Sequence, residues 1–395
     1  MIALKRIKKS GPGARPHVAL LVESSLASGR DILRGIARYG REHEPWSLYY
    51  EPRGLEESVP RWLRHWRGDG IIARIQNQSI AREVRATGLP VVDVLGVVPD
   101  AGVPLVHVDD CKIARLAAAH LHERGFREFG FFGIEGENWS ERRREAFVET
   151  VRQAGSEARI YELPRGGGGG ASWEKMEDIL ARWIAGIGKP AGVMVCSDQR
   201  GPQFLEACRR AGVRVPDEVA VIGVDDDEAL CEVCNPPLSS VKAGHVQVGY
   251  EAAALLDRIM SGRAVPDQPM LVAPQGITTR LSSDVLAIED RPVAEVLRLI
   301  REHACSGIKV ETLARQAGLS RSVLQRRFRT ALGRSVHQEI VNARLKRAKD
   351  LLVTTDLTLA DIAERSGFKY QEYLGAVFKQ RLHKTPVQYR REASY

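Results

Sequence analysis

Two stretches near the carboxyl end of the chain share one pattern and decide its fold. The first reads Val310-Glu-Thr-Leu-Ala-Arg-Gln-Ala317, then Gly318-Leu-Ser320, then Arg321-Ser-Val-Leu-Gln-Arg-Arg-Phe-Arg-Thr-Ala-Leu332 and Gly333. The second reads Thr358-Leu-Ala-Asp-Ile-Ala-Glu-Arg-Ser366, then Gly367-Phe-Lys-Tyr370, then residues 371–382, with a helix-ending Thr385-Pro386. Each predicts a short helix, a turn led by glycine and a longer basic helix. This is the helix-turn-helix pattern, which presents its second helix to the major groove of DNA.

A third helical segment joins the two motifs. Residues 336–352 keep an amphipathic pattern, so we predict one long helix there. A helix of this length fixes the spacing between the two reading helices. One copy of the chain is therefore expected to reach two successive major grooves, which lie about 34 Å apart on DNA.

Positive charge is concentrated in the same region. Residues 291–395 hold 21 Lys and Arg against 10 Asp and Glu, a net charge of +11. The remaining residues hold 37 against 40, a net charge of −3, which the whole-chain value of +8 conceals. A local basic surface is typical of a protein that binds nucleic acid, although a solvated helix face has the same composition.

The composition and the motifs limit the classes of protein to which this chain can belong. A chain of 395 residues, 44% of them apolar, can form two or three domains with real cores. No run approaches 18 apolar residues and the run 18–22 is too short for a signal peptide, so we predict a cytoplasmic protein that does not enter a membrane. Cys231-Glu-Val-Cys234 lacks a second ligand pair, and we assign no metal site and no cofactor. No HExxH or Gly-x-Ser-x-Gly motif is present, so we predict no catalytic residues and no enzyme activity.

Residues 17–285 alternate short apolar runs with helical patterns. The runs that predict strands are 18–22, 70–73, 90–94, 104–108, 129–133, 192–196 and 219–224. The helical patterns among them cover 31–42, 79–87, 109–124 and 140–153, and a further one ends at 211. Such alternation of strands and helices predicts parallel sheets with helices on both faces.

Polar side chains follow three of the predicted strands. They are Glu23, Ser24 and Ser25 after the first strand, Ser197 and Asp198 after 192–196, and Asp225, Asp226 and Asp227 after 219–224. Any one of them could be an ordinary helix N-cap. Ligands of parallel sheets, however, bind outside the carboxyl ends of the strands. Together with Trp139 and Arg143, these residues indicate a polyol site, because carboxylates and arginine bond hydroxyl groups and an aromatic face packs on the C–H surface of a sugar.

Three motifs in this segment resemble a known family. They are His107-Val-Asp-Asp110 leading to His120-Leu-His-Glu-Arg-Gly125, Arg143-Arg-Glu-Ala-Phe147, and Val221-Ile-Gly-Val-Asp-Asp226 followed by Pro237-Leu-Ser-Ser-Val241. Residues 17–285 resemble the periplasmic-binding-protein-like sensor domain of LacI/GalR-type repressors. The resemblance implies that Arg143 and Asp225 hold a sugar, with a further acidic contact at Asp198. We add Ser24 and Trp139 to this predicted ligand set. The N-terminal helix-turn-helix of that family has no counterpart in residues 1–16.

The carboxyl-terminal motifs resemble a second family. Residues 292–391 resemble the AraC/XylS regulators, especially in Ile362-Ala-Glu-Arg-Ser-Gly-Phe368, Phe378-Lys379, Thr385-Pro386 and Tyr389-Arg390. Sensor and reader in this order resemble the regulators of bacterial xylose operons, which share His303-Ala-Cys-Ser-Gly-Ile-Lys-Val310, Ser320-Arg-Ser322 and Trp139. The resemblance implies a homodimer that binds operator DNA, takes D-xylose or a related monosaccharide as effector and contacts RNA polymerase.

The first predicted reading helix, 321–332, has two faces. Leu324, Phe328 and Ala331 share one face and are expected to pack inward. Glutamine can read adenine and arginine can read guanine, so the opposite face is expected to meet base edges. The residues of that face are Ser322, Gln325, Arg326 and Arg329. Arg321 and Arg327 flank it and are expected to bind phosphates.

The second predicted reading helix, 371–382, is less clear. Leu374 and Phe378 are expected to pack inward, which leaves Gln371 and Lys379 toward the DNA. Gly375 costs about 1 kcal/mol of helix propensity relative to Ala, and indicates a close approach either to the DNA backbone or to a packing partner. Family members often have a longer polar residue at the position of Ala376 and Gly at that of His383, so base reading by this motif stays open.

Taken together, the sequence predicts a basic tail over 1–16, an α/β sensor with two parallel-sheet lobes over 17–285, a linker over 286–291 and an all-α double helix-turn-helix domain over 292–395. The function that this layout implies is a sugar-responsive transcription regulator, a D-xylose-dependent activator of pentose catabolic genes. Two alternatives stay open: an effector that is another monosaccharide, and a ligand-independent DNA-binding repressor.

Overall fold

The chain forms two compact units, Met1–Leu286 and Ala287–Tyr395, and each is described by itself. In this computed structural model the described residues are 15–54, 59–164, 173–264, 266–285, 287–288, 290–355 and 357–393. The predicted basic tail lies outside the described residues over 1–14, and the predicted linker lies outside them at 286 and 289. No helix within the described ranges is long and apolar enough to cross a membrane.

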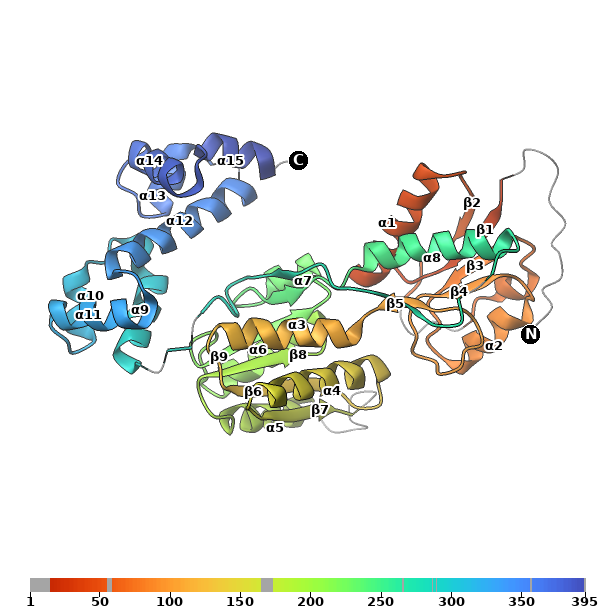
Figure 1. Cartoon of the computed structure of the whole chain (residues 1–395), viewed down its shortest axis with the longest axis horizontal. Helices are drawn as coiled ribbons and strands as arrows, with labels where there is room; N and C mark the ends of the chain where they lie inside the picture. Colours follow the sequence, from red (N-terminus) through yellow and green to blue (C-terminus); the bar gives the residue numbers. More distant parts are fainter. Residues whose placement is uncertain are drawn as a thin grey trace. The chain divides into compact units, whose positions relative to one another are not determined.

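The first lobe of unit 1 is built on a four-stranded parallel sheet (Figure 1). Its strands, in spatial order, are β2 (Ser47–Tyr50), β1 (His17–Leu21), β3 (Gly70–Ala73) and β4 (Val91–Asp93). On one face, α2 (Gln78–Ala86) and the 3-10 turn η1 (Arg61–His65) bury an apolar cluster that includes Leu21 and Ile71. On the other face lie α1 (Ala27–Glu42) and α8 (His245–Met260), which pack against each other.

The crossing of α1 and α8 depends on two glycines. A Cβ atom at Gly35 of α1 would lie 2.0 Å from the carbonyl oxygen of Val246, and one at Gly249 of α8 would lie 2.0 Å from that of Ile32. No side chain fits at these distances, so the two backbones meet only because both residues lack one. Helix α8 is thereby held to the first lobe, although strands of the second lobe precede and follow it in the sequence.

The second lobe is built on a six-stranded sheet. In spatial order its strands are β12 (Ile277–Thr278), β10 (Ser239–Val241), β9 (Val219–Val224), β8 (Ala191–Val195), β6 (Glu128–Ile134) and β7 (Ala158–Leu163), all parallel except β12. Neighbouring side chains of β6 point to opposite faces. Phe131 contacts Phe147 of α4 (Asn138–Gln153), which packs beside α3 (Asp110–Glu123). Phe132 contacts Phe204 of α6 (Gly201–Arg210), which packs beside α5 (Trp173–Ala185).

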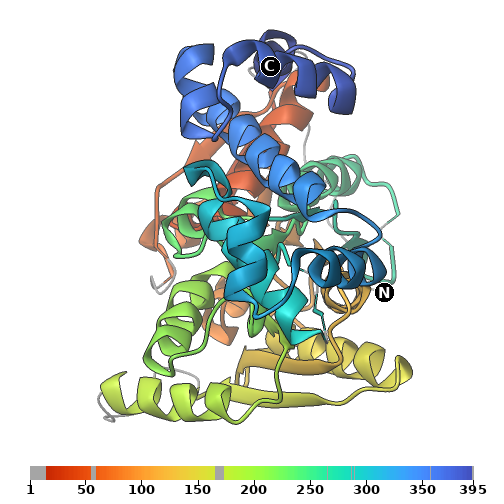
Figure 2. The same ribbon diagram turned by 90° about the vertical axis from the view of Figure 1, so that its left-hand side faces the viewer.

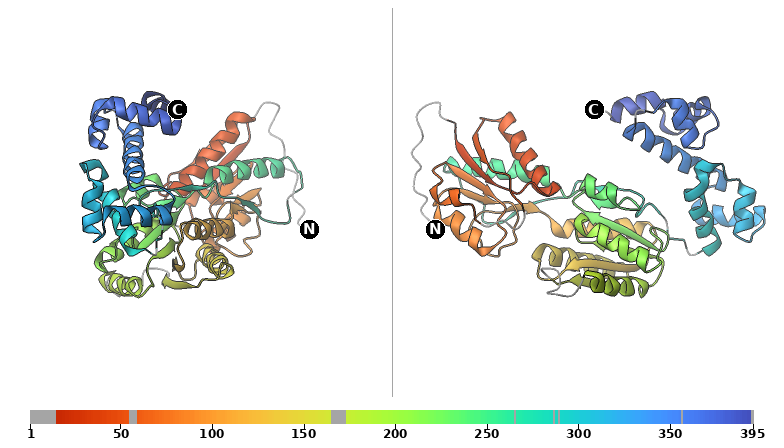
Figure 3. Two further views of the ribbon diagram at one scale, coloured as in Figure 1. Left: turned by 60° about the vertical axis from the view of Figure 1, so that its left-hand side comes forward. Right: turned by 180° about the vertical axis from the view of Figure 1, so that it is seen from behind.

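The chain passes between the lobes along a short pair of parallel strands, β5 (Val106–Val108) and β11 (Met270–Val272). A third passage leads from β10 to α8 through Gly244, whose φ of 94° is left-handed. Figure 3 shows the two lobes and these passages from two further sides. The predicted architecture of two parallel-sheet lobes is confirmed, and the short α7 (Glu228–Val233) follows β9.

Unit 2 contains seven helices among its described residues. They are α9 (Arg291–His303), α10 (Val310–Gln316), α11 (Arg321–Leu332), α12 (Val336–Thr354), α13 (Leu359–Arg365), α14 (Gln371–Leu382) and α15 (Pro386–Ala393). Helix α12 runs between two helical groups (Figure 2). Val336 and Ile340 belong to the core of the first group, whereas Ala348 and Leu352 belong to that of the second. Since one helix contributes to both cores, the spacing of the two motifs is fixed by its length.

The ends of these helices follow from their capping residues. Ser320 and Thr358 accept hydrogen bonds from the backbone of Val323 and Asp361, and Ser335 forms a reciprocal capping box with Gln338. Two expectations need correction. Ala331 is exposed, and the neighbouring Leu332 packs on the core instead. Thr385-Pro386 begins α15 rather than ending α14, because Thr385 and Gln388 exchange capping hydrogen bonds.

The two reading helices end in the same left-handed conformation with different residues. Gly333 follows α11 with φ 67° and His383 follows α14 with φ 56°. A non-glycine residue in this region costs about 1–2 kcal/mol. We therefore expect His383→Gly to raise the free energy of unfolding of unit 2 by up to about 1 kcal/mol, part of the gain being offset by the flexibility of glycine in the unfolded chain.

Urea denaturation of the full chain, followed by circular dichroism, measures this change. Gly333→Ala is the matched control, because a Cβ there would meet no described residue within 4 Å and only the φ angle is strained. It should lower the free energy of unfolding by about 1 kcal/mol. A loss of stability in both variants would contradict the interpretation of His383 as strained.

Candidate functional site

A cavity of about 710 Å³ lies in unit 1 where the carboxyl ends of the strands meet. Residues of the first lobe, of the second lobe and of the passages between them all line it. Cavities of this size hold small molecules, and several polar groups converge in the wall. The residues used below are Ser28 and Arg74 of the first lobe, Trp139, Arg143, Asp198 and Asp225 of the second, and His107 and His245 at the passages.

Four of the five predicted ligand residues line this cavity. Trp139, Arg143, Asp198 and Asp225 are brought together by α4 and by the loops after β8 and β9. Ser24 is not in the wall. Its backbone N–H donates to the carbonyl oxygen of Arg53, and Ser28, in the first turn of α1, lies in the wall instead.

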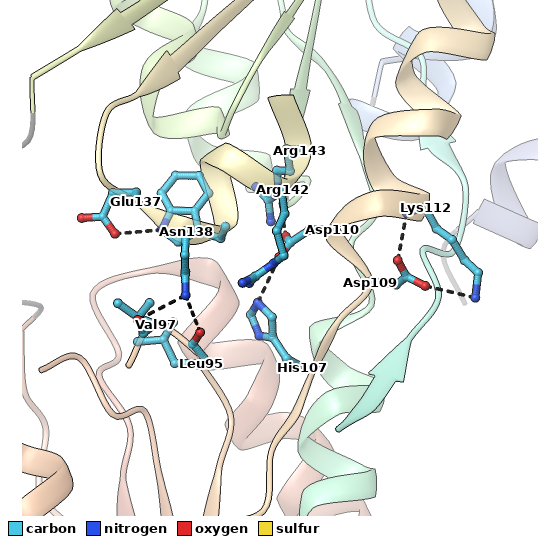
Figure 4. A network of polar contacts seen from close by, with 12 residues as sticks. Leu95, Val97, His107, Asp109, Asp110, Lys112, Glu137, Asn138, Arg142 and Arg143 are labelled. Atoms are coloured by element: carbon cyan, nitrogen blue, oxygen red, sulfur yellow. Dashed lines mark hydrogen bonds and ion pairs between the residues drawn. The ribbon is translucent and has the colours of Figure 1, made fainter. Parts of the chain in front are cut away.

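Asp110 organises the side of the cavity that carries Arg143 (Figure 4). Arg143 donates from Nε to Asp110 Oδ1 at 2.9 Å and from Nη1 to the carbonyl oxygen of Cys196 at 2.6 Å. Arg142 donates twice to Asp110 Oδ2, at 2.8 and 3.0 Å. Burial works to lower the pKa of Arg143, but the carboxylates of Asp110 and Asp225 outweigh it and raise that pKa. The guanidinium of Arg143 also lies 5.0 Å from the ring centre of Trp139.

Asp225 is held by its backbone and by a histidine. Its φ is 108° and that of Asp226 is 53°, both unusual for non-glycine residues, and such strain is concentrated at functional sites. Asp225 Oδ1 lies 3.0 Å from His245 Nε2. Burial would raise the pKa of Asp225, but the hydrogen bond and charge of His245, with Arg143 and Arg74, lower it. Asp225 is thus an anion with a fixed direction.

Asp198 is engaged within the protein. Its Oδ1 accepts from Ser240 Oγ at 2.7 Å, and its Oδ2 accepts from the backbone N–H of Asp227 at 2.9 Å. A Cβ at Gly223 would lie 2.1 Å from Oδ1, so the strand beside it must carry glycine. Burial, and then the charge of Asp225, raise the pKa of Asp198 well above its usual range. The carboxylate of Asp198 is therefore bonded mainly to other groups of the wall and is less directed toward the cavity.

Sequence reasoning missed several polar residues of the wall, among them Arg74, His107 and His245. Arg74 directly follows β3 and donates to Ser28 Oγ at 3.1 Å and to Glu23. Its place after a strand end is a signal that could have identified it. His107 and His245 lie on the passages between the lobes, where only the fold brings them to the cavity.

Two contacts join the lobes at the rim. Asn138 Nδ2 donates to the carbonyl oxygens of Gly96 and Val97 at 2.8 and 3.2 Å (Figure 4). Arg30 Nη2 lies 4.0 Å from Asp227 Oδ2. Within the described ranges no group of three His, Cys, Asp or Glu could hold a metal ion, and Cys231 and Cys234 are buried in the core of the second lobe.

In unit 2, the first reading helix presents its predicted surface. Arg321, Ser322, Arg326 and Arg329 are exposed and Gln325 is half-buried, while Leu324 and Phe328 are buried. Arg327 differs from the expectation. It forms two hydrogen bonds, at 2.7 and 2.8 Å, to Asp290, the N-cap of α9, so it positions that helix rather than facing a phosphate.

The second reading helix exposes Gln371, Ala376 and Lys379. A Cβ at Gly375 would meet nothing within 4 Å among the described residues. The packing explanation for Gly375 is therefore wrong, and close approach to an outside surface stays as the prediction.

Comparison with known proteins shows the family. Residues 17–104 match the family described as XylR N-terminal domain, 118–283 the periplasmic binding protein-like domain and 313–392 the helix-turn-helix domain. The chain is 30% identical over 390 residues to the xylose operon regulatory protein of Escherichia coli strain K12, covering 95% of this chain and 97% of that protein. The chain belongs to the xylose operon regulatory protein family.

Two further similarities agree. The xylose operon regulatory protein of Haemophilus influenzae is 29% identical over 381 residues, covering 94% of this chain and 97% of that protein. A solved structure of the xylose-binding transcription activator xylR has a TM-score of 0.78 at 29% identity, covering 96% and 98% of the two chains. The predicted family and the predicted order of an α/β sensor and an AraC-type reader are confirmed. These relatives are transcription regulators.

The Asp110 network in this family member gives a stability prediction. Asp110→Asn leaves Arg143, which is 4% exposed, without its anion. Removing one partner of a buried ion pair costs about 3–5 kcal/mol, so the free energy of unfolding of unit 1 should fall by that amount. Fluorescence reports this unit selectively, because all six tryptophans lie between Trp46 and Trp183.

Asp109→Asn is the matched control. Asp109 caps α3 and pairs with Lys112, whose side chain is 57% exposed, so the loss should stay near 1 kcal/mol or below. Equal losses in the two variants would show that the Asp110 charge is not the element that holds this wall.

Proposed function

We propose that this chain is a D-xylose-responsive, DNA-binding transcription regulator that activates genes for pentose use. One observation carries the proposal: a family member joins a polar two-lobed cavity, with Trp139, Arg143 and Asp225 in its wall, to two helix-turn-helix motifs. The relatives named xylose operon regulatory protein and xylose-binding transcription activator support the identity of the sugar and the direction of regulation.

The wall groups suit a polyhydroxyl ligand. Among the described residues, no hydrogen bond engages Arg143 Nη2 or Asp225 Oδ2, which leaves one donor and one acceptor for sugar hydroxyls. Trp139 supplies a ring face for the C–H surface of a sugar. Because Asp198 is satisfied by Ser240 and Asp227, its proposed contribution is to shape the wall. Ser24 is replaced in the proposed ligand set by Ser28 and Arg74.

A sugar between the lobes gives a physical route to regulation. Contacts from both lobes to one ligand favour the closed arrangement, in addition to the rim contacts of Asn138 and Arg30. A ligand can shift such an equilibrium only by its difference in affinity for the two states. We propose that closure alters a homodimer that binds two operator half-sites, contacts RNA polymerase and works in the cytoplasm.

D-Xylose should stabilise the wild-type chain. At a hundredfold excess over its Kd, a ligand that binds only the folded state adds about 2.7 kcal/mol to the free energy of unfolding. We expect a rise in melting temperature with D-xylose that Asp225→Ala abolishes and that Asp178→Ala, an exposed carboxylate of α5, leaves intact. A panel of pentoses, hexoses and deoxysugars gives the measurement.

The panel also separates the alternatives. A shift with another sugar alone would keep the sensor and replace the effector. If no sugar of the panel shifts the melting temperature while the chain still binds DNA, the sugar-responsive proposal is overturned. That result would support a ligand-independent DNA-binding protein.

The first reading helix should carry base specificity. Arg326→Ala removes a side chain that can bond guanine twice, so affinity for the operator should fall by about 1–3 kcal/mol and one base position should lose its preference. Arg321→Ala is the contrasting variant, because a phosphate contact carries no sequence information. It should weaken binding to all sequences alike and reduce the salt slope by about 1. Titration of operator variants at several salt concentrations distinguishes the two, and identical profiles would contradict the assignment.

A further inference from the structure

His107 occupies an unusual place in the sensor unit. It lies in the middle of β5, opposite Leu271 of β11, on a passage between the two lobes. His107 is only 6% exposed, yet it belongs to the cavity wall. It is therefore a buried residue whose small exposed part faces the cavity.

Within the described part of the chain, the ring of His107 has no hydrogen bond. Neither Nδ1 nor Nε2 has a hydrogen-bond partner there, and Oδ2 of Asp110 lies 3.7 Å from Nε2, which is too long for a hydrogen bond. The other buried histidines of the described ranges differ. His120 Nε2 lies 2.8 Å from Ser283 Oγ, and His245 Nε2 lies 3.0 Å from Asp225 Oδ1. A buried polar group without a partner is costly, so such an arrangement points to a ligand.

The surroundings of His107 indicate what kind of group would meet it. Burial lowers its pKa to about 4, so near neutral pH the ring is uncharged and has one N–H donor and one acceptor nitrogen. A hydroxyl group also donates and accepts once or more, and it matches such a ring. A phosphate or carboxylate offers acceptors only.

Other buried polar atoms of the same wall also lack partners. Arg74 is paired with Glu23, and Arg143 is paired with Asp110. Among the described residues, Nε of Arg74, Nε of Arg200 and Nδ1 of His245 are nevertheless buried without a hydrogen-bond partner. All three residues line the cavity together with His107, and both histidines belong to the passages between the lobes. The wall therefore holds several polar atoms that a hydroxyl-rich ligand can satisfy.

We propose that His107 is a sugar-contacting residue that determines specificity, and that its neutral ring exchanges hydrogen bonds with one hydroxyl group of the sugar bound in the cavity. This inference rests on the proposed function, because it assigns a residue to the same site. It adds a contact residue that the strand-end rule does not identify and to which the family motif containing His107 assigns no role.

The test uses the full chain and calorimetric titration with D-xylose and its monodeoxy derivatives, each lacking one ring hydroxyl. His107→Leu should weaken D-xylose binding tenfold or more. It should leave unchanged the affinity for the one derivative that lacks the contacted hydroxyl. His107→Gln, which keeps a donor and an acceptor, should stay within a few-fold of the wild type.

Stability separates a ligand role from a structural one. Since His107 has no protein partner to lose, His107→Leu should not lower the melting temperature of the sugar-free chain. His120→Leu is the matched control: it breaks the bond to Ser283, so it should lower the melting temperature and leave the Kd for D-xylose unchanged. If His107→Leu does not fold, the prediction that His107 has no structural role is wrong. The affinities of His107→Gln for D-xylose and its deoxy derivatives then still show whether the residue contacts a hydroxyl group.

Each remaining outcome decides the matter. An unchanged Kd in His107→Leu, or an equal loss for every derivative, would overturn the inference while the proposed function stands. A wild type that binds no sugar of the panel would instead overturn the proposed function itself.

Discussion

The pairing of the Asp110 carboxylate with two arginines is the interaction on which the sensor unit depends. Asp110 lies in the first turn of α3, where the chain enters the second lobe, and a carboxylate is favoured at a helix N-terminus. Arg143 in turn reaches the carbonyl oxygen at the end of β8. One buried anion therefore joins the passage between the lobes, helix α4 and the central sheet. The direction of Arg143 into the cavity follows from these bonds.

Charge balance within the wall extends this argument. Burying an isolated charge is far more costly than burying a satisfied pair, and the buried Arg74 and Arg143 each have a carboxylate, Glu23 and Asp110. Asp225 has His245 and Asp198 has Ser240. The result is a wall rich in polar groups, most of which already bond to other groups of the protein. Rigid pairs of this kind also leave few atoms free, and those few determine what the cavity can recognise.

The success of sequence reasoning followed the strength of each local signal. Continuous apolar runs such as β9 (Val219–Val224) and the capped helices of unit 2 were predicted closely, because burial and capping act through neighbouring residues. The edge strands β2 and β7 were missed, since each has exposed side chains and neither forms a continuous buried apolar run. Arg143 and Asp225 converge because parallel strands end at one edge. His107 was noticed only as part of a family motif, because an inward residue within a strand reads as core unless the fold shows what it faces.

The two reading helices expose different surfaces. Helix α11 exposes long side chains, Arg326 and Arg329, that can form paired bonds with base edges. Helix α14 exposes Ala376, and a Cβ at Gly375 would meet no described residue within 4 Å, although Gln371 and Lys379 are exposed on the same helix. A small-residue surface permits close approach to the DNA backbone, and such contacts add affinity without choosing a sequence. Because α12 contributes to both cores, any contact of the second motif with DNA limits where the first motif can lie.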